Sequence, residues 1–114
     1  MLGNRMGYRF ERAYYRLVYP LAFRPTFVVG GAKFQVVDLS EQGIRYVHPG
    51  PSRPNPGVAV EGLVRLPTGE EVEVEGTVVR VEAPQVALVL SRGVPFGLML
   101  DQQRYLQQRL IAWR

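Results

Sequence analysis

Cysteine is absent from the 114-residue sequence, and histidine occurs once. Without cysteine there are no disulfide bonds, no thiolate catalysis and none of the usual zinc sites. The single histidine, His48, has no acid or nucleophile placed near it by sequence spacing, so the sequence predicts no catalytic base. We therefore expect a protein that is not an enzyme and that has no cofactor or metal.

Long apolar runs are also missing. No stretch is long enough to span a bilayer, and the N-terminal segment MLGNRMGYRF lacks the apolar run of a secretory signal. We expect a cytoplasmic protein without membrane insertion. The hydrophobic fraction of 46% and the charged fraction of 21% are those of an ordinary globular protein, so residues 1–114 are predicted to form one domain.

Lysine is almost absent: Lys33 is the only one, and arginine supplies the rest of the 14 basic side chains, against 10 acidic ones. The net charge is +4. Arginine presents a planar fork of donors that holds a phosphate or a guanine edge at two points, whereas lysine is a point charge. The composition favours a phosphorylated or nucleic acid partner, although genomic base composition or a heat-adapted source explains it equally well.

Alternation of apolar and polar residues predicts an all-β fold. Glu70–Glu82 shows it most clearly, with acids and valines at alternate positions, as in a half-buried strand. The pair Gly30 and Gly31 and the segment Leu66–Gly69 are typical of hairpin turns. The predicted strands are residues 16–23, 32–40, 43–47, 58–66, 70–82, 85–92 and 94–100. About seven short strands joined by turns are typical of a sandwich or barrel.

The pattern changes at Asp101. From there to Trp113 the sequence has no glycine or proline, and its apolar residues, Leu106 and Leu110 among them, recur at helical spacing. We predict one helix over residues 101–113, capped by Asp101. Its apolar stripe packs within its own chain or pairs two copies, so a homodimer stays open.

The segment Asp38–Gly43 reads DLSEQG and combines an acid, a hydroxyl and a glycine between two apolar segments. A turn explains these residue types, because Asp and Ser side chains bond neighbouring amides and Gly43 permits a positive φ. A turn does not explain Arg12 and Arg16, which stand at positions i and i+4 directly before the apolar segment that begins at Leu17.

Together these two elements resemble the paired signature of the PilZ domain family: RxxxR, followed further along by Asp or Asn, any residue, Ser, two of any residue and Gly. Residues 43–47, 75–82, 94–100 and 104–110 also fall where PilZ domains carry strands and a final helix, so the resemblance covers the chain from about Arg9 onward. It implies a six-stranded antiparallel β-barrel with one C-terminal α-helix. The ligand that it implies is the bacterial second messenger cyclic di-GMP.

The resemblance also implies the site residues. Arg12 and Arg16 would hold the phosphates and the faces or edges of the guanines. Asp38 and Ser40 would meet guanine, whose N1 and N2 hydrogens suit a carboxylate. Gly43 would supply the turn.

One departure from the family pattern bears on the number of ligands. Many PilZ domains carry a further arginine directly before the first arginine of RxxxR, and this sequence has Glu11 there. Because that cation helps to accommodate a self-stacked ligand pair, one ligand and a stacked pair both stay open. Arg9 and Arg45 are the additional candidates to supply the charge. Residues 1–16, which carry RxxxR, are expected to form a mobile arm that docks with the ligand.

The favoured function is a cyclic di-GMP receptor that changes conformation on binding and relays the signal to an unidentified partner protein. Two alternatives stay open. The first is a PilZ-like adaptor that binds proteins but no nucleotide. The second is a small barrel that binds single-stranded nucleic acid, which the aromatic residues Tyr8, Phe10, Tyr14 and Tyr15 between the N-terminal arginines favour. Because both motifs are intact, nucleic acid and the adaptor are the less favoured interpretations.

Overall fold

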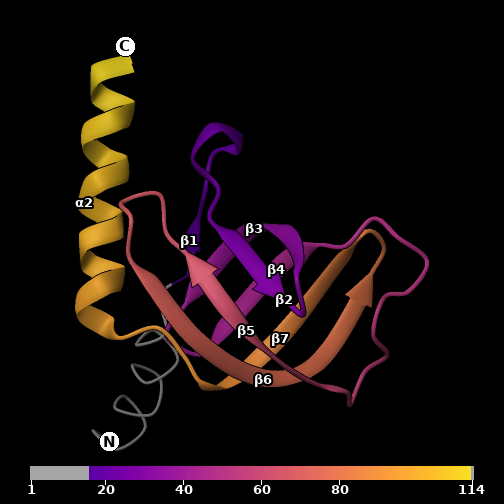
Figure 1. Cartoon of the computed structure of the whole chain (residues 1–114). Coiled ribbons are helices and arrows are strands. Elements are labelled where there is room, and N and C mark those ends of the chain that lie inside the picture. Colours follow the sequence, from indigo (N-terminus) through magenta and orange to yellow (C-terminus); the bar gives the residue numbers. More distant parts are fainter. Residues whose placement is uncertain (1–15, 114) are drawn as a thin grey trace, which may run out of the picture.

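A computed structural model of the chain describes residues 16–113, with side chains as far as residue 110 (Figure 1). Its elements, in chain order, are β1 (Leu17–Val18), the 3-10 helix η1 (Leu21–Phe23), β2 (Thr26–Val29), β3 (Ala32–Ser40), β4 (Gly43–Val47), β5 (Ala59–Arg65), β6 (Glu71–Glu82), β7 (Gln85–Arg92) and α2 (Phe96–Trp113).

Six of the strands close into an antiparallel barrel. Around the barrel they follow the order β3, β2, β5, β6, β7 and β4, and β4 pairs back with β3. β1 is an additional short strand that pairs with the second half of β3, where β2 has ended. Closure satisfies the backbone groups that an open sheet would leave at its edges. The predicted six-stranded antiparallel barrel with one C-terminal helix is confirmed.

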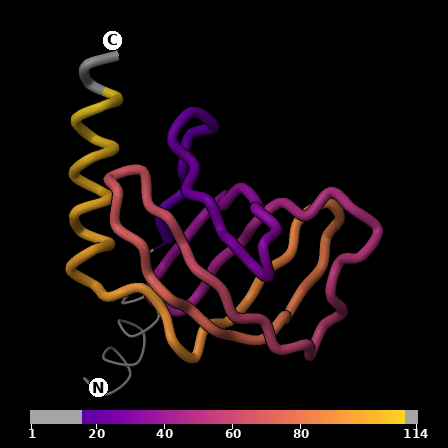
Figure 2. Tube along the Cα trace, viewed as in Figure 1, coloured from indigo at the N-terminus to yellow at the C-terminus, as the bar shows by residue number. Residues whose placement is uncertain are grey.

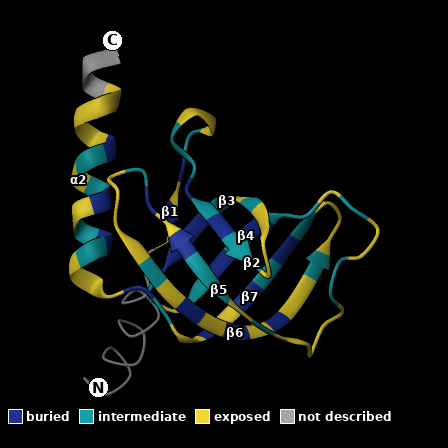
Figure 3. Cartoon of the chain, in the orientation of Figure 1, coloured by how far each residue is buried: buried dark blue, intermediate teal, exposed yellow. Residues whose placement is uncertain are grey.

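The core fills the inside of the barrel with residues at alternate strand positions (Figure 3). Phe27, Val36 and Val64 are fully buried, and the rings of Phe27 and Tyr46 meet edge to face at 5.0 Å. Aromatic and branched side chains of this kind contribute about 1.5 to 3 kcal/mol each on burial. Apolar and polar residues therefore alternate in the sequence because each strand has one face toward the core and one toward solvent.

β6 is the longest strand and bends around the barrel (Figure 1). Its register against β7 shifts at Glu75/Gly76 and again at Val78/Arg80. Gly76 permits the first bend, because a Cβ there would lie 2.2 Å from the carbonyl oxygen of Val89.

Two segments of the N-terminal half differ from the prediction. Residues 16–23 were expected to form one strand, but only Leu17–Val18 is a strand, and Pro20 leads into η1. β2 was not predicted, because four residues after Pro25 are too short for a clear alternation. The expected turn at Gly30 and Gly31 joins β2 to β3, and both glycines have positive φ (55° and 88°).

The C-terminal helix begins earlier than predicted. Residues 94–100 were expected to form a strand and Asp101 to cap a helix, but α2 starts at Phe96. The carbonyl oxygen of Pro95 accepts hydrogen bonds from the backbone amides of Leu98 and Met99, so the helix begins there. A short apolar run fits either a buried strand or a buried helix, and packing against the barrel decides.

The helix α2 stands along one side of the barrel, beside the turn between β5 and β6 (Figure 2). It packs through Met99, Gln102 and Leu106, each of them buried. Tyr105 meets Phe23 edge to face at 6.2 Å, so η1 also rests on the helix. Within the described residues the helix thus packs on its own chain.

Candidate functional site

A β-bulge in β3 determines which of its side chains point to the outer face of the barrel. The register of β3 against β4 shifts by one residue between Val36 and Asp38. Val36 and Leu39 are both fully buried. Since side chains alternate along a strand, Asp38 next to Leu39 points to the outer face, where an unbroken alternation from Val36 would have turned it to the core.

Asp38 lies between two arginines from neighbouring strands. Its Oδ2 is 3.4 Å from Nε of Arg45 on β4 and 3.9 Å from Nη1 of Arg16, which directly precedes β1. The antiparallel pairs Val18–Asp38 and Asp38–Arg45 bring the three side chains together. The Asp38 side chain is 10% exposed and that of Arg16 is 58% exposed, so Arg16 is the group most free to turn toward a ligand.

Burial raises the pKa of the Asp38 carboxyl above its ordinary value, and the charges of Arg45 and then Arg16 offset part of that rise. A carboxylate in this position has lost much of its water. It therefore gains most from N–H donors that a ligand brings.

Ser40 and Gly43 close the hairpin between β3 and β4. The hydroxyl of Ser40 accepts the amide of Gln42 at 3.3 Å, which stabilises the turn. A Cβ at Gly43 would lie 3.3 Å from the Ser40 Oγ and 3.7 Å from the Leu88 carbonyl oxygen. Glycine at this position keeps the space beside the Ser40 hydroxyl open. Gly43 does not adopt the positive φ that the sequence suggested, because it is already the first residue of β4.

These residues surround a pocket of about 270 Å³ on the outer face of the barrel. Five of the predicted site residues line it: Arg16, Asp38, Ser40, Gly43 and Arg45. Arg9 and Arg12 lie outside the described residues. The structure thus brings together every predicted site residue that it describes.

Arg80, Ala87 and Val89 also line the pocket, and they were not predicted. The alternation of β7 shows that Ala87 and Val89 point outward. That of β6 would turn Arg80 inward like Val78, and the register shift between the two residues turns it outward instead. Neither pattern shows which strands lie beside one another. In the structure Ala87 pairs with both Arg45 and Arg80, and Val89 pairs with Gly43. These pairings extend the pocket across β4, β7 and β6.

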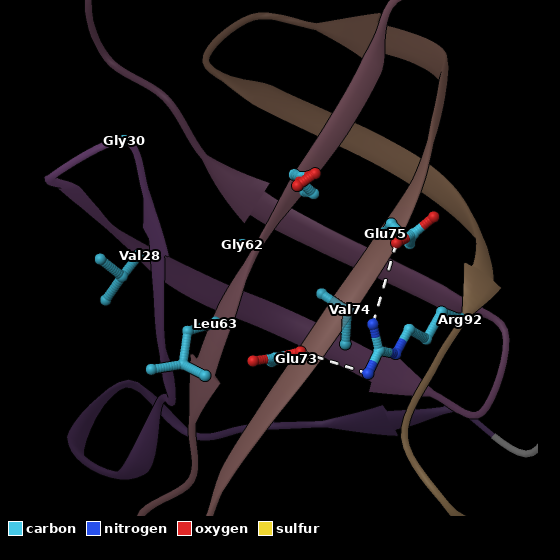
Figure 4. A pocket seen from close by; sticks show the side chains of 9 residues that line it. Val28, Gly30, Gly62, Leu63, Glu73, Val74, Glu75 and Arg92 are labelled. Carbon is cyan, nitrogen blue, oxygen red and sulfur yellow. Dashed lines mark ion pairs between the residues drawn. The ribbon is translucent and has the colours of Figure 1, made fainter.

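A larger groove of about 520 Å³ lies on another part of the outer face, across β2, β5 and β6 (Figure 4). Arg92 is held there by Glu73 at 3.2 Å and Glu75 at 4.0 Å. Because its acids outnumber its arginine, this groove repels an anionic ligand. We favour the smaller pocket as the functional site, since its charge suits a phosphate.

His48 lies in a different hollow, where its ring stacks on Phe34 at 4.5 Å. Among residues 16–113 we find no group of three or more side chains arranged to hold a metal ion. In the same part of the chain, neither helix combines the length and apolar character that crossing a membrane requires.

The family model for the PilZ domain matches residues 9–113, nearly the whole chain. The chain belongs to the PilZ domain family. In this PilZ domain the second motif, Asp38, Ser40 and Gly43, lies in one pocket with Arg16 of the first motif.

Solved structures that share the fold include the following two. The Bacillus subtilis inhibitor of motility (MotI/DgrA) matches with a TM-score of 0.62 and 21% identity over 90% of this chain and 53% of that one. An uncharacterized Legionella protein matches with a TM-score of 0.58 and 16% identity over 84% of this chain and 98% of that one. This PilZ domain therefore spans about half the length of the Bacillus chain. No curated protein matches the sequence.

Proposed function

We propose that this PilZ domain is a bacterial, cytoplasmic receptor for cyclic di-GMP that passes the signal to a partner protein without catalysing a reaction. The observation that carries the proposal is the convergence of Arg16, Asp38, Ser40, Gly43 and Arg45 on one outward pocket. Membership of the PilZ family supports it.

The chemistry of the pocket suits the ligand. Guanine presents N1–H and N2–H donors on one edge, which the desolvated Asp38 carboxylate accepts, and O6 and N7 acceptors on another, which an arginine fork binds. Arg45 stays beside Asp38, with its side chain 30% exposed. Arg16 leaves its long 3.9 Å contact to Asp38 and takes a phosphate. Arg12 joins it, as the family signature implies.

Binding at Arg16 reaches α2 through a chain of hydrogen bonds. Tyr19, just after β1, donates its hydroxyl to Gln102 Oε1 at 2.9 Å, and Gln102 Nε2 donates to Thr68 Oγ1 at 2.7 Å. Thr68 in turn bonds Glu70. Ligand that fixes the segment before Tyr19 therefore acts on the packing of α2. We place the surface that signals to the partner beside β1 and α2.

Calorimetric titration with cyclic di-GMP tests the proposal. Arg16→Ala and Asp38→Ala are each expected to weaken binding at least tenfold, about 1.4 kcal/mol, because each removes a charge-assisted contact. Arg92→Ala is the matched control: its side chain is 60% exposed and ion-paired like that of Arg16, but it lies in the acidic groove. Its binding should equal that of the wild type.

Two results would decide against the receptor, and a third against the proposed site. Absence of binding at millimolar ligand favours the adaptor that binds no nucleotide. Tighter binding of a single-stranded oligonucleotide, weakening steeply with salt, favours the nucleic acid alternative. Equal losses from Arg16→Ala and Arg92→Ala, with the fold preserved, place the ligand elsewhere.

A further inference from the structure

A second pair of an acid and an arginine lies beside the pocket. On β6, Nη1 of Arg80 lies 3.9 Å from Oε2 of Glu82, and the two side chains are 62% and 65% exposed. The first such pair is Asp38 with Arg45. Both pairs face the same side of the barrel, because Arg80 and Asp38 line one pocket.

Strand register sets the distance between the two pairs. Asp38 pairs with Arg45, Arg45 with Ala87, and Ala87 with Arg80. Neighbouring strands lie about 4.8 Å apart, so the path from Asp38 to Arg80 along the curved surface of the barrel is about 14 Å. That span exceeds one purine ring and accommodates a second ring beside the first.

The surface between the pairs is small and apolar. Ala87 separates Arg45 from Arg80, and Val89 next to it is 52% exposed. The pocket continues into a small hollow that shares Arg45, Arg80 and Ala87 with it and adds Glu82 and Gln85. Contact with the flat face of a base buries apolar surface of this kind favourably, whereas contact with a hydrated phosphate does not.

The carboxylate of Glu82 points to the same choice. At 3.9 Å it offsets the charge of the Arg80 guanidinium, whereas Asp38 is shared by Arg16 and Arg45, which leaves a net positive charge there. A phosphate therefore favours Arg16, and a neutral guanine needs only the donors of Arg80. Arginine binds guanine at O6 and N7 with both arms of its fork.

We propose that Arg80 binds the O6 and N7 edge of the second guanine of cyclic di-GMP, with that base lying over Ala87 and Val89. The inference rests on the proposed function, because it names a further contact of the same ligand. It gives Arg80 the role of a specificity-determining residue, while Asp38 and Arg45 bind the first guanine.

Titration with two ligands tests it: cyclic di-GMP and 3′,3′-cyclic GMP-AMP, in which one guanine is an adenine whose N6 amine replaces O6. The wild type is expected to prefer cyclic di-GMP at least tenfold, since the mixed ligand places its adenine at Arg80. Arg80→Ala should bind cyclic di-GMP at least tenfold more weakly and should bind the two ligands nearly equally. Arg80→Lys should behave like Arg80→Ala, because lysine keeps the charge but not the fork.

Arg92→Ala again serves as the control, because Arg92 matches Arg80 in exposure and in having glutamate partners. It should keep both the affinity and the preference. Wild-type binding that depends on Asp38 but not on Arg80 overturns this inference and leaves the receptor intact. Full affinity in Arg80→Lys overturns it as well, because charge alone then suffices. If the wild type binds neither ligand, the receptor and this inference fail together.

Discussion

Asp38 is a carboxylate in a place that favours the neutral form. Its side chain is 10% exposed, and burial raises its pKa despite Arg45 and Arg16 beside it. A carboxyl that binds its proton more tightly in the folded protein than in the unfolded chain lowers the free energy of unfolding as pH rises from the unfolded pKa, about 3.9, to the folded one. Ionisation of Asp38 is therefore expected to strengthen ligand binding while it lowers the free energy of unfolding.

Asp38→Asn is expected to separate these two effects. The amide does not ionise, so the melting temperature of the variant minus that of the wild type should be larger at about pH 7 than at about pH 3. All other titrating groups are common to both proteins, and only the wild type carries the cost of ionising Asp38. Its affinity for cyclic di-GMP should fall. Thermal unfolding at both pH values measures the first effect and titration the second.

Glu71→Gln is a suitable comparison, because Glu71 is 51% exposed and pairs with Arg65 outside the pocket. Its melting temperature should follow that of the wild type at both pH values. A wild type that gains stability over Asp38→Asn as pH rises would mean that Arg45 and Arg16 outweigh the burial.

The helix α2 packs on the barrel through apolar side chains, and a buried pair of hydrogen bonds lies among them. Gln102 is fully buried between Met99 and Leu106 and bonds both Tyr19 and Thr68. Burial raises the pKa of Tyr19, so its hydroxyl stays protonated and remains a donor. The hydrogen bond fixes how α2 sits on the segment that follows Arg16.

Tyr19→Phe is expected to lower the free energy of unfolding by about 1 to 3 kcal/mol, because it leaves the Gln102 carbonyl buried without its donor. Gln102→Met should have a similar effect by leaving the Tyr19 hydroxyl unpaired. The double variant should lose less than the sum of the two, since no polar group is then left alone. Urea unfolding measures all three, and strictly additive losses would show that the two groups do not act as a pair.

On the described part of the molecule, the two hollows of the outer face differ in charge. Arg16, Arg45 and Arg80 surround the pocket, whereas Glu73 and Glu75 dominate the groove of Figure 4. The net charge of +4 says nothing of this separation. An anionic ligand meets a positive face and is turned away from the acidic one.

Binding of cyclic di-GMP should therefore weaken with salt. Between about 0.1 M and 1 M salt the screening length falls from about 10 Å to about 3 Å, which reduces the attraction of exposed arginines for the phosphates. Titrations over this range should show a severalfold loss in the wild type and a smaller one in Arg16→Ala, which has lost an exposed cation. Arg92→Ala should follow the wild type. A salt dependence unchanged by Arg16→Ala would remove that side chain from the phosphate contacts.

The sequence by itself determined the class of fold and half of the site. Valines alternating with acids over Glu71–Glu82 require one wet and one dry face, and the spacing within Asp38–Gly43 marks the hairpin that carries the motif. Both are local properties: side chains of a strand alternate every two residues, and a side chain such as that of Ser40 stabilises a turn by bonding a nearby amide. They can be inferred without knowing which strands are neighbours.

Only the tertiary structure decided which strands are neighbours and which side chains share the pocket. The bulge in β3 that turns Asp38 outward depends on its pairing with β4, and Arg80 joins the pocket because β6 pairs with β7 and β7 with β4. The start of α2 at Phe96 follows from packing on the barrel and not from the apolar run that looked like a strand. Strand register and helix docking are set by contacts between residues far apart in the chain, which local periodicity does not encode.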